Sequence, residues 1–516
     1  MATIKELLQQ LDRLNQIGVA LSAERNTDRL LETILLAAKE LAGADAGTLY
    51  RVEDGWLKFE ILRTDSLGIA LGGTAEQKPS LPPIPLCRPD GQPNEAMIVA
   101  CAAIHGRTIN IEDAYAVGDY DFTGTRQFDS RTGYRSKSFL TVPMKNHENE
   151  IIGVLQLINA MDAMGHIIPF SAASQKLVES LASQAAIALT NRQLIDQLEG
   201  LFEALIKLIN TAIDKKSHNI GFHCERVPVL TMMLAEAVHA TDSGPLKEFH
   251  MTDADRYELK IAGLLHDCGK IATPVHVVEK ATKLQTLFDR IALIDTRFEV
   301  LKRDLQIARL QGQLTEAQYH SQLEQLDTDR QCVRQANKGG EFMSAEDIAR
   351  IEQIAARQWC GPDGQLQPLL STEETANLSI SRGTLNADER AIINQHINDT
   401  IEMLEQLPWP RHLQHVPEYA GGHHERMDGK GYPRHLTRDQ MSIQARIMAI
   451  ADVFEALTAS DRPYKPPMKL SQVLSIMGNM AATGHVDPDL YDVFVQKKVY
   501  MQYAQQFLGR EQLDVQ

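Results

Sequence analysis

Seven side chains whose types suit metal binding are spread over the second half of the sequence. The adjacent pair His423–His424 lies in the run GGHHERMDGKGYP, whose glycines allow tight turns and close backbone approach. Because adjacent residues cannot both lie on one buried face of a regular helix, this run suits a ligand site better than a core. The other candidate ligands are His223, His266, Asp267, His396 and Asp452.

Each candidate has an ordinary structural explanation when it is taken alone. A single histidine such as His396 is more often a hydrogen-bonded structural residue, and a carboxylate such as Asp452 can cap a neighbouring helix. Together, however, seven nitrogen and oxygen ligands exceed what one cation needs. The set therefore predicts two or more metals that share a bridging carboxylate, and its imidazoles and carboxylates suit Fe, Mn, Ni or Zn better than Mg or Ca.

Such a centre would act on a phosphate. Two cations about 3.5–4 Å apart can share an attacking hydroxide and stabilise an in-line displacement at phosphorus. Lys270 follows His266–Asp267 by one helical turn, so its ammonium can approach a phosphate held there. A solvated lysine is the alternative explanation for this residue.

The composition limits the classes of protein that have to be considered. A chain of 516 residues that is 43% hydrophobic predicts two to four domains with sizeable cores. A net charge of -16 argues against a sequence-independent nucleic-acid binder, whereas a metal site sets its own local field for a small anion. Six scattered cysteines without a CxxC pair indicate reduced thiols in a cytoplasmic protein. The N-terminal residues lack the apolar stretch of a signal peptide, and the sequence has no apolar run of about 18 residues, so neither a signal peptide nor a membrane span is expected.

The N-terminal part, residues 1–170, has the pattern of an α+β sensor domain. Apolar residues at helical spacing predict a helix over residues 1–40. Strand-like stretches follow at residues 47–52, 56–63, 139–144 and 151–159.

A long connecting helix is predicted over residues 171–210. Its apolar seam has spacings that alternate between four and three, as in a coiled coil, and runs through Ile187, Asn191, Leu194, Leu198, Leu201, Leu205 and Leu208. This pattern favours a parallel dimer stalk in which Asn191 sets the register. A helix packed on its own domain is the alternative.

Beyond residue 210 the pattern is almost entirely helical. A second heptad seam begins at Leu284 and continues through Leu287 and Ile291 to Ala308, and a further helix is predicted over 315–337. Together they predict an antiparallel helical hairpin. Ser344 and Asp347 mark the start of the next helix, and residues 360–383 are expected to form a loop.

Four separated motifs resemble one family when they are read together. HDCGK, the distant His396, HHERMDGKGYP and ADVFEALTASDRPYK resemble the HD-GYP phosphodiesterases, bacterial enzymes of the HD metallohydrolase superfamily that cleave cyclic di-GMP. The resemblance covers residues 210–283 and 384–500. It implies that residues 211–505 form an all-α bundle with a bi- or trinuclear centre that often holds iron or manganese.

The resemblance also implies roles for individual residues. All seven candidates would be metal ligands, with Asp267 as the bridge, and Lys270 would contact the scissile phosphate or protonate the leaving group. Arg462 and Lys465 in DRPYK would contact phosphate and guanine. Tyr432 of the GYP run would also lie at the substrate, and that run is implicated in contacts with GGDEF-domain partners.

The chain departs from the family pattern in two places. Some members carry a third-metal carboxylate where this chain has Asn219, so two metals are expected here. About a hundred additional residues, 284–383, interrupt the link between HDCGK and His396. They could form a lid, a dimer arm, a partner dock or a solvated appendage.

The N-terminal domain is similar to the GAF domains of cyclic-nucleotide phosphodiesterases. The resemblance is carried by INIEDAYAVGDYDF and RTGYRSKSFLTVPMKNHENEIIGVLQLINA. Ligand-binding members carry an NK…F…DE signature, but Ala160 follows Asn159 here, and Ser174-Gln175 stand where the acidic pair would follow Phe170. The resemblance thus implies the fold and leaves the GAF ligand unknown, with dimerisation alone as an alternative role.

These inferences predict a cytoplasmic, homodimeric phosphodiesterase that hydrolyses cyclic di-GMP to linear pGpG under the control of a GAF sensor, with GMP as the alternative final product. A related alternative is a hydrolase of cyclic GMP–AMP. The other alternative is a non-catalytic nucleotide-sensing adaptor. Such an adaptor would be expected to have lost metal ligands, whereas all seven candidate ligands are present. No nucleic-acid polymer is expected as a partner.

Overall fold

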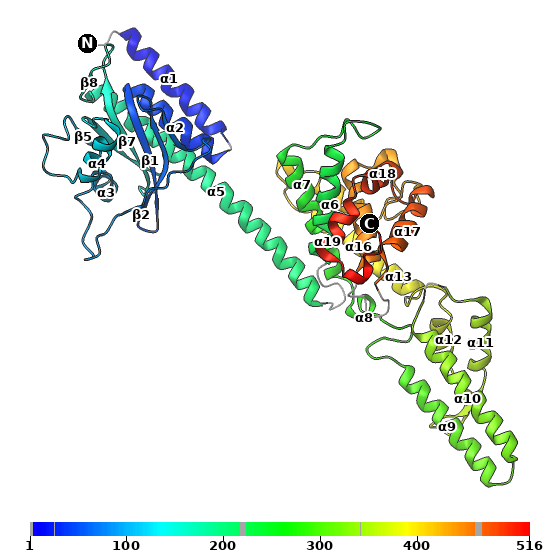
Figure 1. Cartoon of the computed structure of the whole chain (residues 1–516). Helices are drawn as coiled ribbons and strands as arrows, with labels where there is room; N and C mark the ends of the chain where they lie inside the picture. Colours follow the sequence, from blue (N-terminus) through cyan, green and yellow to red (C-terminus); the bar gives the residue numbers. More distant parts are fainter. Residues whose placement is uncertain (1–3, 25, 217–222, 341, 460–466, 516) are drawn as a thin grey trace. The chain divides into compact units, whose positions relative to one another are not determined.

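The computed structural model describes residues 4–24, 26–216, 223–340, 342–459 and 467–515. The chain divides into two compact units, Met1–Phe202 and Glu203–Gln516 (Figure 1). The predicted combination of an α+β unit, a long helix and a mostly helical second unit is confirmed. Within the described ranges, no helix combines the length and the apolar character needed to cross a bilayer.

The first unit is built on one antiparallel sheet. Its main strand order is β3-β2-β1-β7-β6-β5, with β4 paired to β2 and β8 to β7. The strands are β1 (Ala44–Glu53), β2 (Trp56–Thr64), β3 (Ile69–Gly72), β4 (Ile84–Pro85), β5 (Ile109–Ile111), β6 (Phe139–Lys145), β7 (Ile151–Met161) and β8 (Ile167–Ile168).

Helices cover both faces of this sheet (Figure 1). On one face α1 (Ile4–Ala23), α2 (Thr27–Ala42) and the first turns of the long helix share a core with the strands. On the other face α3 (Ile98–His105) packs in a second core, and α4 (Thr123–Thr132) follows it in sequence. The helix predicted over residues 1–40 is two helices, because the side chain of Asn26 accepts the Arg29 N–H and starts α2 anew.

The long helix α5 runs from Ala172 to Lys216. The Ser171 hydroxyl accepts the N–H of Ser174 at its start. Val178, Leu181 and Ala185 then lie in the sheet core. The leucines of the predicted seam, from Leu194 to Leu208, are 46–64% exposed, so in the described structure the seam is not buried on its own domain.

A different face of α5 is buried in the second unit. Ile206 and Ile213 are 2% and 1% exposed, and Asn210 between them donates from Nδ2 to the carbonyl of Leu264 at 2.9 Å. Lys216 donates to the carbonyl of Ile271. The end of the helix is therefore bonded to the chain on both sides of the HDCGK motif, residues 266–270.

The second unit is a bundle around the buried helix α16 (Ile443–Thr458), which packs against α6 (His223–His239). The other helices of the bundle are α7 (Asp253–Leu265), η1 (Cys268–Ile271), α8 (Val275–Val278), α13 (Ala387–Asn394), α14 (His396–Glu405), η2 (Arg411–Leu413), α15 (Val416–Gly421), η3 (Arg438–Gln440), α17 (Leu470–Ala482), α18 (Pro488–Gln496), α19 (Val499–Phe507) and η4 (Arg510–Gln512).

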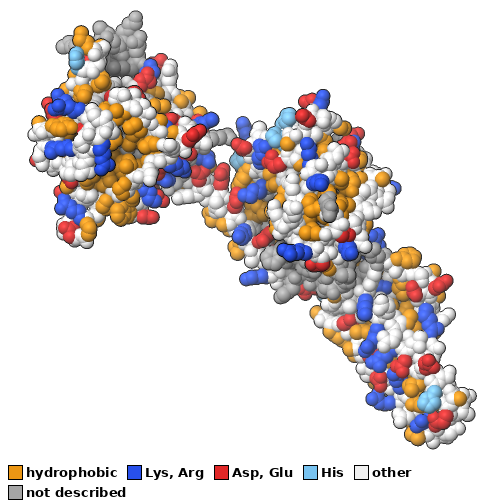
Figure 2. All heavy atoms as spheres, in the orientation of Figure 1, with side chains coloured by type: hydrophobic (Ala, Val, Ile, Leu, Met, Phe, Trp, Pro, Cys, Tyr) orange, Lys and Arg blue, Asp and Glu red, His pale blue; other side chains and the backbone are white. Residues whose placement is uncertain are grey.

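Residues 284–383, hereafter the insert, form a subdomain with its own hydrophobic core. The antiparallel hairpin of α9 (Ile291–Leu310) and α10 (Glu316–Asn337) is present as predicted (Figure 1). The remaining elements are α11 (Ala345–Ala355), β9 (Gln358–Cys360), β10 (Leu366–Pro368) and α12 (Thr372–Leu378). In the view of Figure 2, acidic and basic side chains are interspersed over this subdomain.

Two predictions for the insert are wrong. The helical seam does not include Leu284 and Leu287, because α9 begins only at Ile291 and Leu287 is 95% exposed. The segment expected to be a loop, residues 360–383, contains α12 and also β10, which pairs with β9 at the start of that segment. Ser371 and Glu374 form a capping box at the start of α12, a local signal that the polar composition concealed.

The two ends of the insert lie side by side. The hydroxyl of Thr384 donates to the carbonyl of Lys280 at 2.9 Å, and the buried ammonium of Lys280 pairs with Glu389 at 2.7 Å. Lys283 donates its backbone N–H to the carbonyl of Asn337 at 2.9 Å and its ammonium to the carbonyl of Leu378 at 2.9 Å. The chain thus leaves and re-enters the bundle at one place.

Candidate metal centre

Helix ends bring most of the seven candidate ligands together. His223 and His396 are the first residues of α6 and α14, and His266 and Asp267 directly follow α7. His423 and His424 follow α15, whereas Asp452 lies within α16. Outside the regular helix, adjacent side chains can turn to the same side, which is why both sequence-adjacent pairs can face one site.

The seven residues form two neighbouring groups. In the first, the Nε2 atoms of His223 and His266 lie 3.1 and 3.2 Å from Oδ2 of Asp267. Oδ1 of Asp452 lies 3.3 Å from His223 Nε2. All four side chains are largely withdrawn from solvent.

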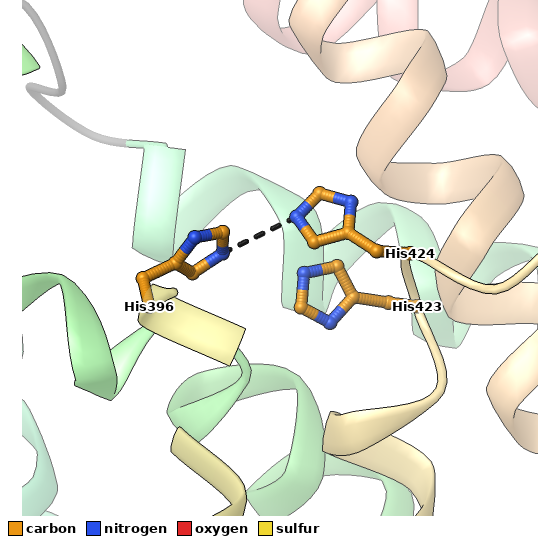
Figure 3. Close-up of side chains that lie close together, drawn as sticks. All are labelled: His396, His423 and His424. Carbon is orange, nitrogen blue, oxygen red and sulfur yellow. Dashed lines mark hydrogen bonds between the residues drawn. The ribbon is translucent and has the colours of Figure 1, made fainter. Parts of the chain in front are cut away.

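The second group consists of His396, His423 and His424 (Figure 3). Nε2 of His424 lies 3.2 Å from Nε2 of His396, and the rings of His423 and His424 are 4.1 Å apart between centroids. Oδ1 of Asp267 lies 3.3 Å from His396 Nε2. The two oxygens of Asp267 therefore face different groups.

Hydrogen bonds fix the orientation of the imidazoles. Three histidines donate from Nδ1 to the carbonyl three residues earlier, which leaves the lone pair of Nε2 directed at the centre. The pairs are His266 with Gly263 at 2.7 Å, His396 with Ile393 at 2.5 Å and His423 with Ala420 at 2.6 Å.

A cation fits this arrangement. In the described part of the chain, Oδ1 of Asp267 and Nε2 of His423 are buried and take part in no hydrogen bond. Such atoms are costly to bury unless something electropositive compensates them. Both are acceptors aimed into a cluster of other acceptors, which is the situation that a divalent metal resolves.

The charges of the centre shift its titration strongly. Burial alone would raise the pKa of Asp267, but the Lys270 ammonium and the neighbouring imidazoles outweigh it and hold that pKa well below the ordinary value. Burial lowers the pKa of His424 to about 4 and that of His423 well below its ordinary value. Both rings are therefore neutral near pH 7, the form that binds metals.

Lys270 lies at the centre, where Nζ donates to Oδ2 of Asp267 at 2.5 Å. Burial acts to lower the pKa of Lys270, but Asp267 outweighs it and raises that pKa, so the ammonium is charged. A fixed positive charge is thus placed beside the candidate bridging carboxylate.

Close packing explains the glycine of HDCGK. The N–H of Gly269 donates to the hydroxyl of Thr400 on α14 at 2.9 Å. A Cβ at position 269 would lie 2.1 Å from the carbonyl oxygen of His396 and 2.5 Å from the Thr400 nitrogen. Only glycine lets η1 approach the first turn of α14 closely enough to bring Asp267 beside His396.

The GYP run folds back over His424. The ring of Tyr432 stacks on that of His424 with 4.9 Å between centroids, and its N–H donates to the His424 carbonyl at 3.2 Å. The buried carboxylate of Glu425 holds the loop by accepting the N–H groups of Arg434 and Leu436 at 2.7 and 2.9 Å. Burial raises the pKa of Tyr432, so its hydroxyl is protonated.

Three residues singled out in the sequence, Asn219, Arg462 and Lys465, lie outside the described residues. Two residues at the centre were not predicted: Glu455, which contacts His223 at 2.5 Å, and Thr400. The signal for Glu455 was its position one helical turn after Asp452, on the same side of α16. Thr400 has no comparable signal in the sequence.

Comparisons with known protein families assign both units. A family model described as GAF domain matches residues 26–189. Models described as HD domain match residues 220–337 and 372–490. An HD domain implies binding of divalent metal, in agreement with the clustered histidines and aspartates.

Three curated relatives come from Vibrio cholerae. The "3'3'-cGAMP-specific phosphodiesterase 1" is 42% identical over 123 residues, which is 24% of this chain and 27% of the relative. The "3'3'-cGAMP-specific phosphodiesterase 2" is 40% identical over 115 residues, 22% of this chain and 21% of the relative. A "Probable cyclic di-GMP phosphodiesterase" is 33% identical over 141 residues, 26% of this chain and 32% of the relative. The chain thus spans a third or less of the length of each of these relatives.

Proposed function

We propose that this chain, which carries a GAF domain and an HD domain, is a metal-dependent phosphodiesterase of the HD-GYP type that hydrolyses cyclic di-GMP to linear pGpG. The observation that carries the proposal is the position of Asp267, whose two oxygens lie between two histidine groups. That arrangement suits one carboxylate that bridges two cations.

The proposed ligand sets follow the two groups. His223, His266 and Asp452 would hold one cation and His396, His423 and His424 the other, with Asp267 shared. Fe or Mn matches this mixture of imidazole and carboxylate, and Ni or Zn also fits. A pair of such cations supplies a water of lowered pKa and stabilises negative charge at phosphorus.

The residues around the metals would bind and orient the dinucleotide. We assign Lys270 to the scissile phosphate or the leaving oxygen, because its charged ammonium already lies beside Asp267. Tyr432 would border the substrate, since its ring covers His424. Arg462 and Lys465 are proposed as phosphate and guanine contacts from their place in the motif DRPYK.

Cyclic GMP–AMP is the second candidate substrate. Of the three relatives described above, the two named for 3'3'-cGAMP are 42% and 40% identical over the matched residues, and the probable cyclic di-GMP phosphodiesterase is 33% identical. The two substrates share their phosphates and one base, so the ligand sets described above serve either.

The decisive experiment compares both substrates on one protein. The full chain is loaded with Mn²⁺ or Fe²⁺ and incubated with each cyclic dinucleotide, and chromatography follows the linear products and GMP. We expect turnover of cyclic di-GMP and its loss, by at least about a thousandfold, in Asp267→Asn, because removing a bridging charge disrupts both cation positions. Asp304→Asn, at an exposed position of α9, is the matched control and should keep full activity. Faster hydrolysis of cyclic GMP–AMP would identify that dinucleotide as the substrate in place of cyclic di-GMP. A metal-loaded protein that hydrolyses neither dinucleotide would favour the alternative of a non-catalytic nucleotide-sensing adaptor.

We further propose that the active form is a homodimer joined through the GAF domain and the exposed seam of α5, controlled by an unidentified GAF ligand. The cytoplasm is the proposed location, since the substrate is a cellular second messenger and the six cysteines are free thiols. GGDEF-domain proteins are proposed partners of the GYP run.

A further inference from the structure

His223 differs from three other histidines of the centre in how its Nδ1 is held. His266, His396 and His423 each use a carbonyl three residues earlier in the chain. His223 is the first residue of α6, and its Nδ1 instead pairs with Oε2 of Glu455 at 2.5 Å. A side chain from another helix therefore supplies what the local backbone supplies elsewhere.

Glu455 is itself held rigidly. It is 1% exposed, and its other oxygen, Oε1, accepts Nε and a terminal nitrogen of Arg226, both at 2.6 Å. Arg226 lies three residues after His223 on α6, so the ring and the guanidinium face the same carboxylate from one helix. The ion pair compensates the buried charge and fixes the direction of the carboxylate.

The spacing on α16 gives this contact its significance. Asp452 and Glu455 are three residues apart, about 60° around the helix and 4.5 Å along it. Asp452 lies 3.3 Å from Nε2 of His223, and Glu455 lies 2.5 Å from Nδ1. Two carboxylates from one turn of α16 thus contact the two ring nitrogens of His223, one each.

We propose that Glu455 is the positioning residue of the metal centre: it fixes the ring and tautomer of His223, so that Nε2 is directed at the position shared with Asp267 and Asp452. The inference rests on the proposed metal-dependent function and extends it to a residue outside the ligand set. Loss of a carboxylate that is hydrogen-bonded to the outer nitrogen of a metal-binding histidine typically lowers metal affinity by roughly 10–100-fold.

Metal binding tests the role without depending on turnover. Metal-free protein is titrated with Mn²⁺, followed by the electron paramagnetic resonance of the free ion, and with Co²⁺, followed by its visible absorption. We expect Glu455→Gln to weaken one of two bound cations by roughly 10–100-fold and to alter the Co²⁺ spectrum, with Glu455→Leu more strongly affected.

The matched control is Glu374→Gln in the insert. Glu374 is 3% exposed and pairs with Arg297 through both oxygens, so it is an equally buried carboxylate–arginine pair away from the centre. It should lower stability without changing metal affinity or spectrum. Should Glu455→Leu not fold, Glu455→Gln still decides the question.

The positioning role is overturned if Glu455→Gln binds both cations with wild-type affinity and an unchanged spectrum. Wild-type protein that binds two cations yet hydrolyses neither dinucleotide would refute the proposed function while leaving the role of Glu455 measurable. The two failures are therefore distinguishable.

Discussion

At the scale of single residues, the protonation of His223 must change when a metal binds at the centre. Burial alone would lower the pKa of His223, but its hydrogen bonds to Asp267, Asp452 and Glu455 outweigh burial and raise that pKa well above 6.5. In the metal-free protein a proton on His223 therefore compensates two carboxylates. That proton occupies the direction from which a cation would be bound, so metal binding has to release it.

The first residue-scale prediction concerns pH. Between pH 6.5 and the raised pKa of His223, the folded metal-free protein holds a proton that the unfolded chain has lost. The contribution of His223 to the free energy of unfolding is therefore complete below pH 6.5 and decreases as the pH rises through this window. Because a cation displaces the proton, metal affinity should rise with pH over the same window, by up to about tenfold per unit for one proton. Calorimetric titration in buffers of different ionisation enthalpy measures the protons released. An affinity independent of pH there would contradict the assignment.

The second residue-scale prediction concerns Gly269. In Gly269→Ala the new Cβ would overlap backbone atoms of His396 and Thr400, which cannot move without shifting α14. We expect a loss of about 1–3 kcal/mol in the free energy of unfolding together with weaker metal binding, measured by denaturant melts and metal titration.

Gly200→Ala provides the control for that substitution. Gly200 lies inside α5 with nothing within 4 Å of an added Cβ, so alanine there should raise helix stability by roughly 0.5–1 kcal/mol. Equal effects of the two substitutions would mean that the close approach at Gly269 is unimportant.

The chemistry of the candidate site was more accessible from sequence than its supporting contacts. The residue types and spacing of the histidines and aspartates in motifs such as HDCGK and GGHHER predict metal binding from the sequence alone. Glu455 and Thr400 act through contacts between helices that are far apart in sequence, His223 with Glu455 and Gly269 with Thr400. The spacing from Asp452 indicates the side of α16 on which Glu455 lies, but the partner of a side chain on a remote element cannot be read from the sequence, so only the tertiary structure identifies these contacts.

At the scale of elements, the insert has a hydrophobic core of its own. Its buried residues form their own cluster, and the bonds of Lys280, Lys283 and Thr384 join its ends to the bundle. Periodicity was sufficient to predict the α9–α10 hairpin. It failed at residues 284–290 and 360–383, because irregular chain at the base of a subdomain and short elements lack a repeat long enough to detect.

The element-scale prediction is that the insert can be removed without loss of the metal centre. All seven candidate ligands lie outside residues 284–383, so a chain in which a short glycine linker replaces residues 286–382 should bind the same number of cations. Metal analysis and thermal melting measure this. Loss of both cations would show that the insert supports the centre. Retained metal with altered turnover would identify it as a lid or dock.

At the scale of the whole molecule, α5 is one continuous helix with two different faces. Its first turns belong to the sheet core, its last turns are bonded to Leu264 and Ile271 beside the HDCGK motif, and the leucine seam lies exposed along its length. The exposed seam was predictable because a heptad repeat is a local pattern. The contacts of Asn210 with Leu264 and of Lys216 with Ile271 were not predictable, because each joins residues that are far apart in the sequence.

The whole-molecule prediction concerns the seam. Leu198→Glu with Leu205→Glu places charges at seam positions that are 64% and 50% exposed, so two copies should separate without unfolding. Light scattering should give twice 57.6 kDa for the wild type and 57.6 kDa for the variant. Gln197→Glu, an exposed position outside the seam, should stay dimeric. A monomeric wild type would refute the stalk.

The adjacent ends of the insert have a consequence for the order of folding. His266–Asp267 and His396 must meet although about 130 residues separate them, against about 30 without the insert, and two doublings of a loop add roughly 1.2 kcal/mol of closure entropy. Once the insert has folded, Lys280 and Thr384 are already joined, and the remaining loop is as short as if the insert were absent. We therefore expect the insert to fold before the bundle, so that a segment without a single ligand speeds the assembly of the centre.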